Sequence, residues 1–155
     1  MPTISPDAMP DRDRQLLVHT RDMTSTLANF YRGDLRVEVL QVSQSHGLYL
    51  REVFLRTLAE DRIVEYGVMA VALDQFTTAQ QAIIRTGRTP LGALLHQAEI
   101  PFKSSPLQYF TSPAAKLAST PLAPYARGAC YGRINQLSKS TGEPLAWIVE
   151  ILPCP

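Results

Sequence analysis

The stretch Leu48 to Leu58, LYLREVFLRTL, carries two adjacent charges, Arg51 and Glu52, inside an otherwise apolar segment. Its aromatic and β-branched residues, with no Gly or Pro, predict a β-strand. Successive side chains of a strand point to opposite faces, so Arg51 shares a face with Tyr49 and Glu52 lies on the other. Both faces are apolar near the centre, so one charge is expected to point inward. A buried Arg51 keeps its proton and needs an anion, from another strand or from a ligand.

The composition is that of an ordinary globular domain. The chain has 155 residues, of which 45% are hydrophobic and 19% charged, and its net charge of +1 offers no basic surface for nucleic acid or an anionic membrane. No apolar run is long enough to span a membrane. Residues 1–10 are polar and rich in proline, which predicts a loose tail without a signal peptide. Residues 11–155 are expected to form one domain.

The two cysteines, Cys130 and Cys154, do not make a disulfide framework, which favours a reducing cytoplasm. We interpret Cys130 as a packing residue and expect no role for Cys154. The three histidines show no metal-ligand spacing, and the chain has no phosphate-binding or nucleophile motif. We therefore expect no metal and no cofactor.

Hydrophobic periodicity places three consecutive strands early in the chain, joined by short links, at 34–43, 48–58 and 63–73. Such an arrangement predicts an antiparallel meander. Segment 128–138 is a further candidate strand, and 145–152, apolar on both faces, is expected to be a central one. Five of the twelve prolines fall between residues 100 and 125, so we expect irregular structure there, with 100–127 as a lid over any pocket.

Helical spacing and capping signals predict helices at 11–19, 74–87 and 90–98, and another that starts after Asp22 or Thr24 and ends before Gly33. Asp74 is the expected cap of the third in chain order. Because the helices fall in blocks and do not alternate with single strands, the fold class is α+β with an antiparallel sheet.

Glu150 is the second charge within an apolar strand segment. An isolated buried carboxylate is costly, so it is expected to pair or to stay protonated. Two interpretations remain open. Arg51 and Glu150 form a structural ion pair in the core, or they line a pocket for a small ligand.

The sequence GRTPLG, residues 87–92, predicts a helix capped by Thr89 with Pro90 as its first residue. The backbone N–H groups of Leu91 and Gly92 would then be free to bind an anion, and Arg88 could add charge. The alternative is a well-capped helix without a ligand.

Several of these motifs, in this order, resemble those of the chorismate pyruvate-lyase family. The resemblance covers about residues 16–153 and is carried by Asp22-Met23-Thr24, Leu50-Arg51-Glu52, the GRTPLG segment, Tyr131 to Leu137, Gly142 to Leu145 and Val149 to Pro153. It implies a single-domain α+β fold with a six-stranded antiparallel sheet and a closed pocket. It also implies cofactor-free conversion of chorismate to 4-hydroxybenzoate and pyruvate, a first step toward the ring of ubiquinone or plastoquinone.

The resemblance assigns roles to individual residues. Arg51 would hold the ring carboxylate, helped by backbone N–H groups near Met23 and Leu91, and Glu150 would contact the 4-hydroxyl group. Family members carry a second arginine where this chain has Val68, so Arg88 and Arg133 are the candidates for the second carboxylate. The enzyme would need no macromolecular partner, and we expect a monomer, with a dimer as the alternative.

A second hypothesis comes from the effector-binding domains of GntR-type regulators, which are similar in fold and in their closing sequence. On that hypothesis the chain binds a small aromatic acid and does not convert it.

Overall fold

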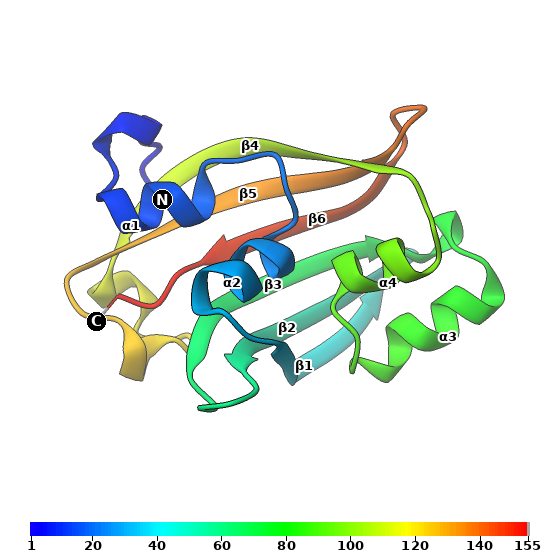
Figure 1. Ribbon diagram of the computed structural model, residues 1–155, viewed down its shortest axis with the longest axis horizontal. Coiled ribbons are helices and arrows are strands. Elements are labelled where there is room, and N and C mark those ends of the chain that lie inside the picture. The colour runs from blue at the N-terminus through cyan, green and yellow to red at the C-terminus, as the bar shows by residue number, and fades with distance from the viewer. Residues whose placement is uncertain (155) are drawn as a thin grey trace.

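The strand predicted around Arg51 is present as β2, Leu48–Thr57, and it lies within a six-stranded antiparallel sheet (Figure 1). The structure, a computed structural model, describes residues 1–154. The sheet order is β1-β2-β3-β6-β5-β4. The other strands are β1 (Leu35–Ser45), β3 (Ile63–Ala72), β4 (Phe102–Pro113), β5 (Ala129–Lys139) and β6 (Pro144–Ile151). The predicted meander is confirmed, and the final strand is central, as its two apolar faces indicated.

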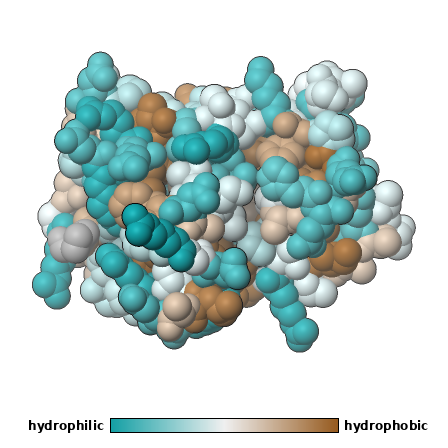
Figure 2. All heavy atoms as spheres, in the orientation of Figure 1, coloured by the Kyte–Doolittle hydropathy of each residue, from teal (hydrophilic) through white to brown (hydrophobic). Residues whose placement is uncertain are grey.

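Four α-helices accompany the sheet, together with short 3-10 turns at Pro6–Ala8, Leu73–Gln75, Ala114–Leu117 and Ala123–Tyr125. The helices are α1 (Asp11–Leu17), α2 (Met23–Tyr31), α3 (Thr78–Thr86) and α4 (Leu91–Gln97). Figure 1 shows α1, α2 and α4 over one face of the sheet. In the same view, Figure 2 shows mostly polar side chains on this face, with apolar residues in separate patches.

Two predicted caps are wrong. The cap of α3 is Thr77 and not Asp74, because Thr77 and Gln80 form a reciprocal capping box. The cap of α4 is Pro90 and not Thr89, and no side chain bonds to the first turn. In α2, by contrast, the Asp22 side chain accepts a hydrogen bond of 2.9 Å from the Ser25 N–H, as a cap at that position predicts.

The region expected to be an irregular lid contains β4, which is an error of the sequence-based prediction. β4 pairs with β5 along its whole length and forms one edge of the sheet. Proline lacks a backbone N–H and is tolerated at a sheet edge, where that donor would have no partner strand. The pairing register shifts between Pro106 and Gln108, so the strand absorbs one proline at a bulge.

The first ten residues do not form the loose tail that was expected. Thr3 forms a bridge with Phe110 of β4, and the Ile4 N–H donates to the Tyr109 carbonyl at 3.0 Å. The side chain of Met9 is buried beneath α1 and α2. This segment therefore partly covers the outer edge of β4.

Cys130 and Cys154 form a disulfide bond, so the expectation that Cys154 has no role is wrong. Cys130 is buried in an apolar core, as a packing residue would be, and it also carries the bond. The sequence separation of 24 residues gave no signal, but β5 and the chain after β6 bring the two Cα atoms to 5.2 Å. The cysteines therefore no longer support a reducing compartment. Within residues 1–154 there is no helix of sufficient length and apolarity to cross a membrane.

The helix-covered face buries two apolar cores. One, beneath α3 and α4, includes Tyr49 and Val71, and the other, beneath α1 and α2, includes Leu27 and Leu55. These two cores meet over β2 and β3, where the first turns of α2 and α4 lie on the same face of the sheet and line one pocket. The candidate site lies at this junction.

Candidate functional site

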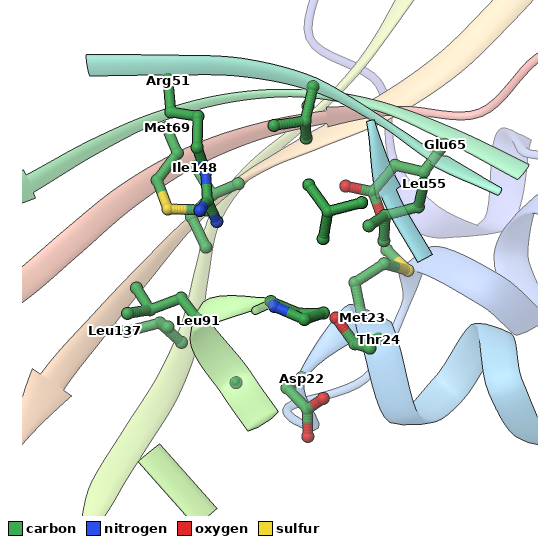
Figure 3. Close-up of a pocket in the computed structure, with 15 residues that line it drawn as sticks. Asp22, Met23, Thr24, Arg51, Leu55, Glu65, Met69, Leu91, Leu137 and Ile148 are labelled. Carbon is green, nitrogen blue, oxygen red and sulfur yellow. The ribbon is translucent and has the colours of Figure 1, made fainter. Parts of the chain in front are cut away.

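A pocket lies between the sheet and the first turns of α2 and α4 (Figure 3). The cavity has a volume of about 40 Å³. Its walls are mainly apolar, formed by Val37, Val53, Leu55, Met69, Leu137 and Ile148. A narrow, apolar pocket with a few polar groups is typical of small-ligand sites.

Arg51 supplies the positive charge of the pocket. Its side chain points from β2 into the cavity, and the residue is only 3% exposed. The Nε and Nη1 atoms are buried without a hydrogen-bond partner among the described residues. Burial lowers the pKa of the Arg51 guanidinium, but an arginine side chain remains a cation in proteins. The protein thus leaves a buried cation without the anion that it requires.

Glu65 is a second buried charge-bearing residue of the pocket, and the sequence analysis missed it. It lies on β3, is 4% exposed, and its Oε2 atom has no partner among the described residues. Figure 3 shows Glu65 and Arg51 on different sides of the cavity. Burial raises the pKa of Glu65 well above its ordinary value, and the nearby Glu150 carboxylate raises it further. Burial therefore favours the protonated, neutral form of Glu65. A carboxylate inside the apolar segment Ile63 to Ala72 was the signal that could have identified it.

Glu150 is not part of the pocket lining and does not pair with Arg51. Its Oε2 atom accepts a hydrogen bond of 2.5 Å from Nε of Arg133, and both residues are buried. Arg133 also donates to the carbonyls of Leu17 and His19, at 3.1 and 2.9 Å, and to that of Arg21 at 3.2 Å. The acid side chain that lies on a different side of the cavity from Arg51 is Glu65 and not Glu150.

The Arg133–Glu150 pair has a different use in the structure. The three carbonyls that Arg133 binds belong to the link between α1 and α2, which leads directly into the pocket wall at Asp22 to Thr24. The pair therefore fixes the position of the first turn of α2. Arg133 is already engaged by the protein, because Nε, Nη1 and Nη2 each donate at least one hydrogen bond within it.

The predicted residues Met23, Leu91 and Gly92 all line the pocket, together with Arg51. Gly92 also has a packing role, since a Cβ there would lie 3.1 Å from Oδ2 of Asp22. The glycine thus lets Asp22 pack against α4. Figure 3 shows the Asp22 carboxylate turned away from the cavity.

Asp22 is held by Ser25 and, at 3.3 Å, by His96. Burial opposes its ionisation, but the hydrogen bonds from Ser25 and His96 prevail and lower the pKa of Asp22. Arg88 is exposed and does not line the pocket, so the structure does not bring it to the other predicted residues. Val68, at the position of the family's second arginine, is 37% exposed and points to the opposite face of the sheet.

Metal ligands do not gather within the described part of the chain, where no three His, Cys, Asp or Glu side chains are placed to hold an ion.

Comparison with solved structures identifies the fold. Gene product SA0254 from Staphylococcus aureus superposes with a TM-score of 0.60 at 9% identity, over 88% of this chain and 90% of that one. PhnF from Mycobacterium smegmatis gives 0.63 at 12% identity, over 88% of this chain and 65% of PhnF. The possible transcriptional regulator YydK from Bacillus subtilis gives 0.54 at 6% identity, over 76% and 57%. The chain has the chorismate lyase-like fold.

No family model matches the sequence, and no curated protein matches it. At these identities the likeness establishes the fold alone. The chain spans about two thirds of PhnF and somewhat over half of YydK, so these two proteins contain additional parts.

Proposed function

We propose that the pocket binds a small aromatic carboxylic acid, and that the chain acts as a ligand-sensing module that leaves this acid unchanged. The observation that carries the proposal is the buried guanidinium of Arg51, which has no anionic partner among residues 1–154 and faces an apolar cavity. A carboxylate ligand would supply the missing anion. One solved structure with this fold, YydK, is described as a possible transcriptional regulator, which also supports a sensing role.

Arg51 and Glu65 lie on different sides of the cavity, with apolar residues between them. Val53 and Gly67 lie next to each other in the β2–β3 register and form a smooth floor between Arg51 and Glu65. Met23 and Leu91 close the site from the helix side. A ring carboxylate beside Arg51 would gain charge-assisted hydrogen bonds, which contribute about 1.5–3 kcal/mol each when desolvated.

The test is calorimetric titration of the full chain with 4-hydroxybenzoate and with its neutral amide, 4-hydroxybenzamide. We expect the acid to bind and the amide to bind at least tenfold more weakly, because only the acid neutralises Arg51. Arg51→Met should lose the preference for the acid. Arg85→Met, which removes an exposed arginine of α3 outside the pocket, is the matched control and should keep it. Equal binding of acid and amide by the unmodified protein contradicts the proposal.

A second candidate function is the chorismate lyase reaction. It is favoured by one observation, the convergence of Arg51, Met23, Leu91 and Gly92 on one pocket, as the resemblance implies. Loss of the C4 proton and cleavage of the ether bond give an aromatic ring and pyruvate, so the protein has mainly to hold a reactive conformer. In this geometry Glu65, and not Glu150, is the acid group within the pocket.

The two functions are separated by incubating the protein with chorismate and following 4-hydroxybenzoate by ultraviolet absorbance. Product formation above the spontaneous rate, abolished in Arg51→Ala, would establish the lyase. Binding of 4-hydroxybenzoate without such turnover would establish the sensing module.

A further inference from the structure

Glu65 is a buried acid to which the proposed binding of a carboxylate at Arg51 assigns no role. Its Oε2 atom has no partner among the described residues, although the residue is 4% exposed and lines the cavity. A buried polar atom without a partner is destabilising, so its retention in a pocket indicates a partner that the protein itself does not supply.

The charged groups that face Glu65 do not neutralise it. Arg133, on β5, already bonds Glu150 and three backbone carbonyls. Glu150, on β6, is a like charge, and Asp22 at the start of α2 turns away from the cavity. Arg51 pairs in register with Met69, four residues along β3 from Glu65, so the two Cα atoms are separated by about 14 Å. Burial raises the pKa of Glu65 and so favours its protonated form, which presents an O–H donor as well as an acceptor.

The floor of the pocket brings this group toward the ligand. Gly67 lies on the same face of β3, and a Cβ there would sit 3.1 Å from Oε1 of Glu65. The absence of a side chain at Gly67 lets the carboxyl group lean over the floor, toward the space between Arg51 and Glu65.

We propose that Glu65 determines specificity, by hydrogen bonding to an uncharged polar group that the ligand carries across the ring from its carboxylate. This inference rests on the proposed binding of an aromatic acid at Arg51. The ligand class is then a ring acid with a hydroxyl or carbonyl group opposite the carboxylate.

This arrangement should disfavour two kinds of analogue, one without a polar group opposite the carboxylate and one with a second carboxylate there. An unsubstituted ring leaves the Glu65 carboxyl unpaired in an apolar enclosure, and sites built to hydrogen-bond a group reject analogues that lack it. A second carboxylate in the same place would bring another negative charge beside Glu150, with Arg133 already occupied. Both analogues should therefore bind more weakly than the hydroxylated acid.

The experiment compares 4-hydroxybenzoate, benzoate and terephthalate, titrated into the full chain and into Glu65→Gln and Glu65→Leu. For the unmodified protein we expect 4-hydroxybenzoate to bind about tenfold more tightly than benzoate, the effect of one neutral hydrogen bond, and terephthalate to bind most weakly. Glu65→Gln keeps a neutral donor and acceptor and should keep the preference. Glu65→Leu should abolish it and bind benzoate at least as well as the hydroxylated acid.

The outcomes separate a failure of this inference from a failure of the proposed function. If both acids bind through Arg51 and Glu65→Leu shows the same ratio as the unmodified protein, this inference is wrong while the proposed function stands. If neither acid binds the unmodified protein, both are overturned. Should Glu65→Leu fail to fold, as judged by circular dichroism, Glu65→Met provides the same apolar test with a more adaptable side chain.

Discussion

Replacing Arg51 with methionine is expected to stabilise the ligand-free protein while it removes ligand binding. The guanidinium of Arg51 is buried, and its Nε and Nη1 atoms have no partner in the described chain. Each unsatisfied buried donor costs about 1–3 kcal/mol, and replacing buried charges by apolar groups of similar volume often stabilises by about 1–4 kcal/mol. A gain of about 2 kcal/mol would raise the Tm of a chain of this size by roughly 4–8 °C.

Arg133 provides the matched control on the same face of the sheet. It is also fully buried, but it bonds Glu150 and the carbonyls of Leu17, His19 and Arg21. Arg133→Met leaves a buried carboxylate and three carbonyls without their donor, and breaking such a pair typically destabilises by about 3–5 kcal/mol. The two substitutions are chemically identical, so their opposite signs would report only the environment of each guanidinium.

The assay is urea unfolding followed by circular dichroism, on protein refolded from urea so that no ligand is carried over. A changed midpoint with an unchanged slope identifies a change in stability. The reasoning is refuted if Arg51→Met lowers the free energy of unfolding by as much as Arg133→Met, because Arg51 would then be satisfied in the protein and would need no ligand.

Three further predictions concern other parts of the molecule. Glu65 binds its proton more tightly in the folded than in the unfolded chain, so its contribution to stability is complete below pH 4.5. Above that pH the contribution falls by about 1.4 kcal/mol per pH unit, until the pH passes the folded pKa. The free energy of unfolding, measured with urea between pH 5 and 8, should therefore decline less steeply with pH in Glu65→Gln. Reduction of the Cys130–Cys154 bond, or replacement of both cysteines by serine, should lower the free energy of unfolding by about 3.5 kcal/mol, because the unfolded chain gains loop entropy. The measurement is the urea midpoint, compared with that of the unmodified, oxidised protein. Gly67→Ala should weaken 4-hydroxybenzoate binding in calorimetry while the fold persists, because its Cβ meets Glu65 and fills the floor, whereas unaltered affinity would show that the ring lies elsewhere.

The strands around Arg51 could be predicted because alternation of side chains is a local property. The segments at β1, β2 and β3 each show it, and the short links between them leave an antiparallel meander as the simplest arrangement. The inward direction of Arg51 follows from the same alternation and from the apolar neighbours on its face. β4 escaped prediction because its prolines, which argue against a strand in most settings, are compatible with the edge position that only the complete sheet reveals.

The site could be predicted only in part, for a related reason. Glu65 and Glu150 both interrupt apolar strands, and sequence alone gives them the same status. Which carboxyl faces the pocket depends on the pairing of β6 with β5, since that register places Arg133 directly opposite Glu150. No local sequence pattern predicts this ion pair, because its two residues lie on different strands. The family resemblance pointed to Glu150 and so to the carboxyl that, in this chain, is already bonded.

Two buried arginines on one face of the sheet thus have different roles in the site. Arg133 bonds Glu150 and the link between α1 and α2, and so it holds the first turn of α2 against the sheet. That turn supplies Met23 to the pocket wall. Because Glu150 is bonded to Arg133, it does not neutralise Arg51, whose Nε and Nη1 atoms have no partner among the described residues. A buried cation without an anion in an apolar pocket is costly to the protein alone, so a carboxylate ligand would relieve that cost when it binds beside Arg51.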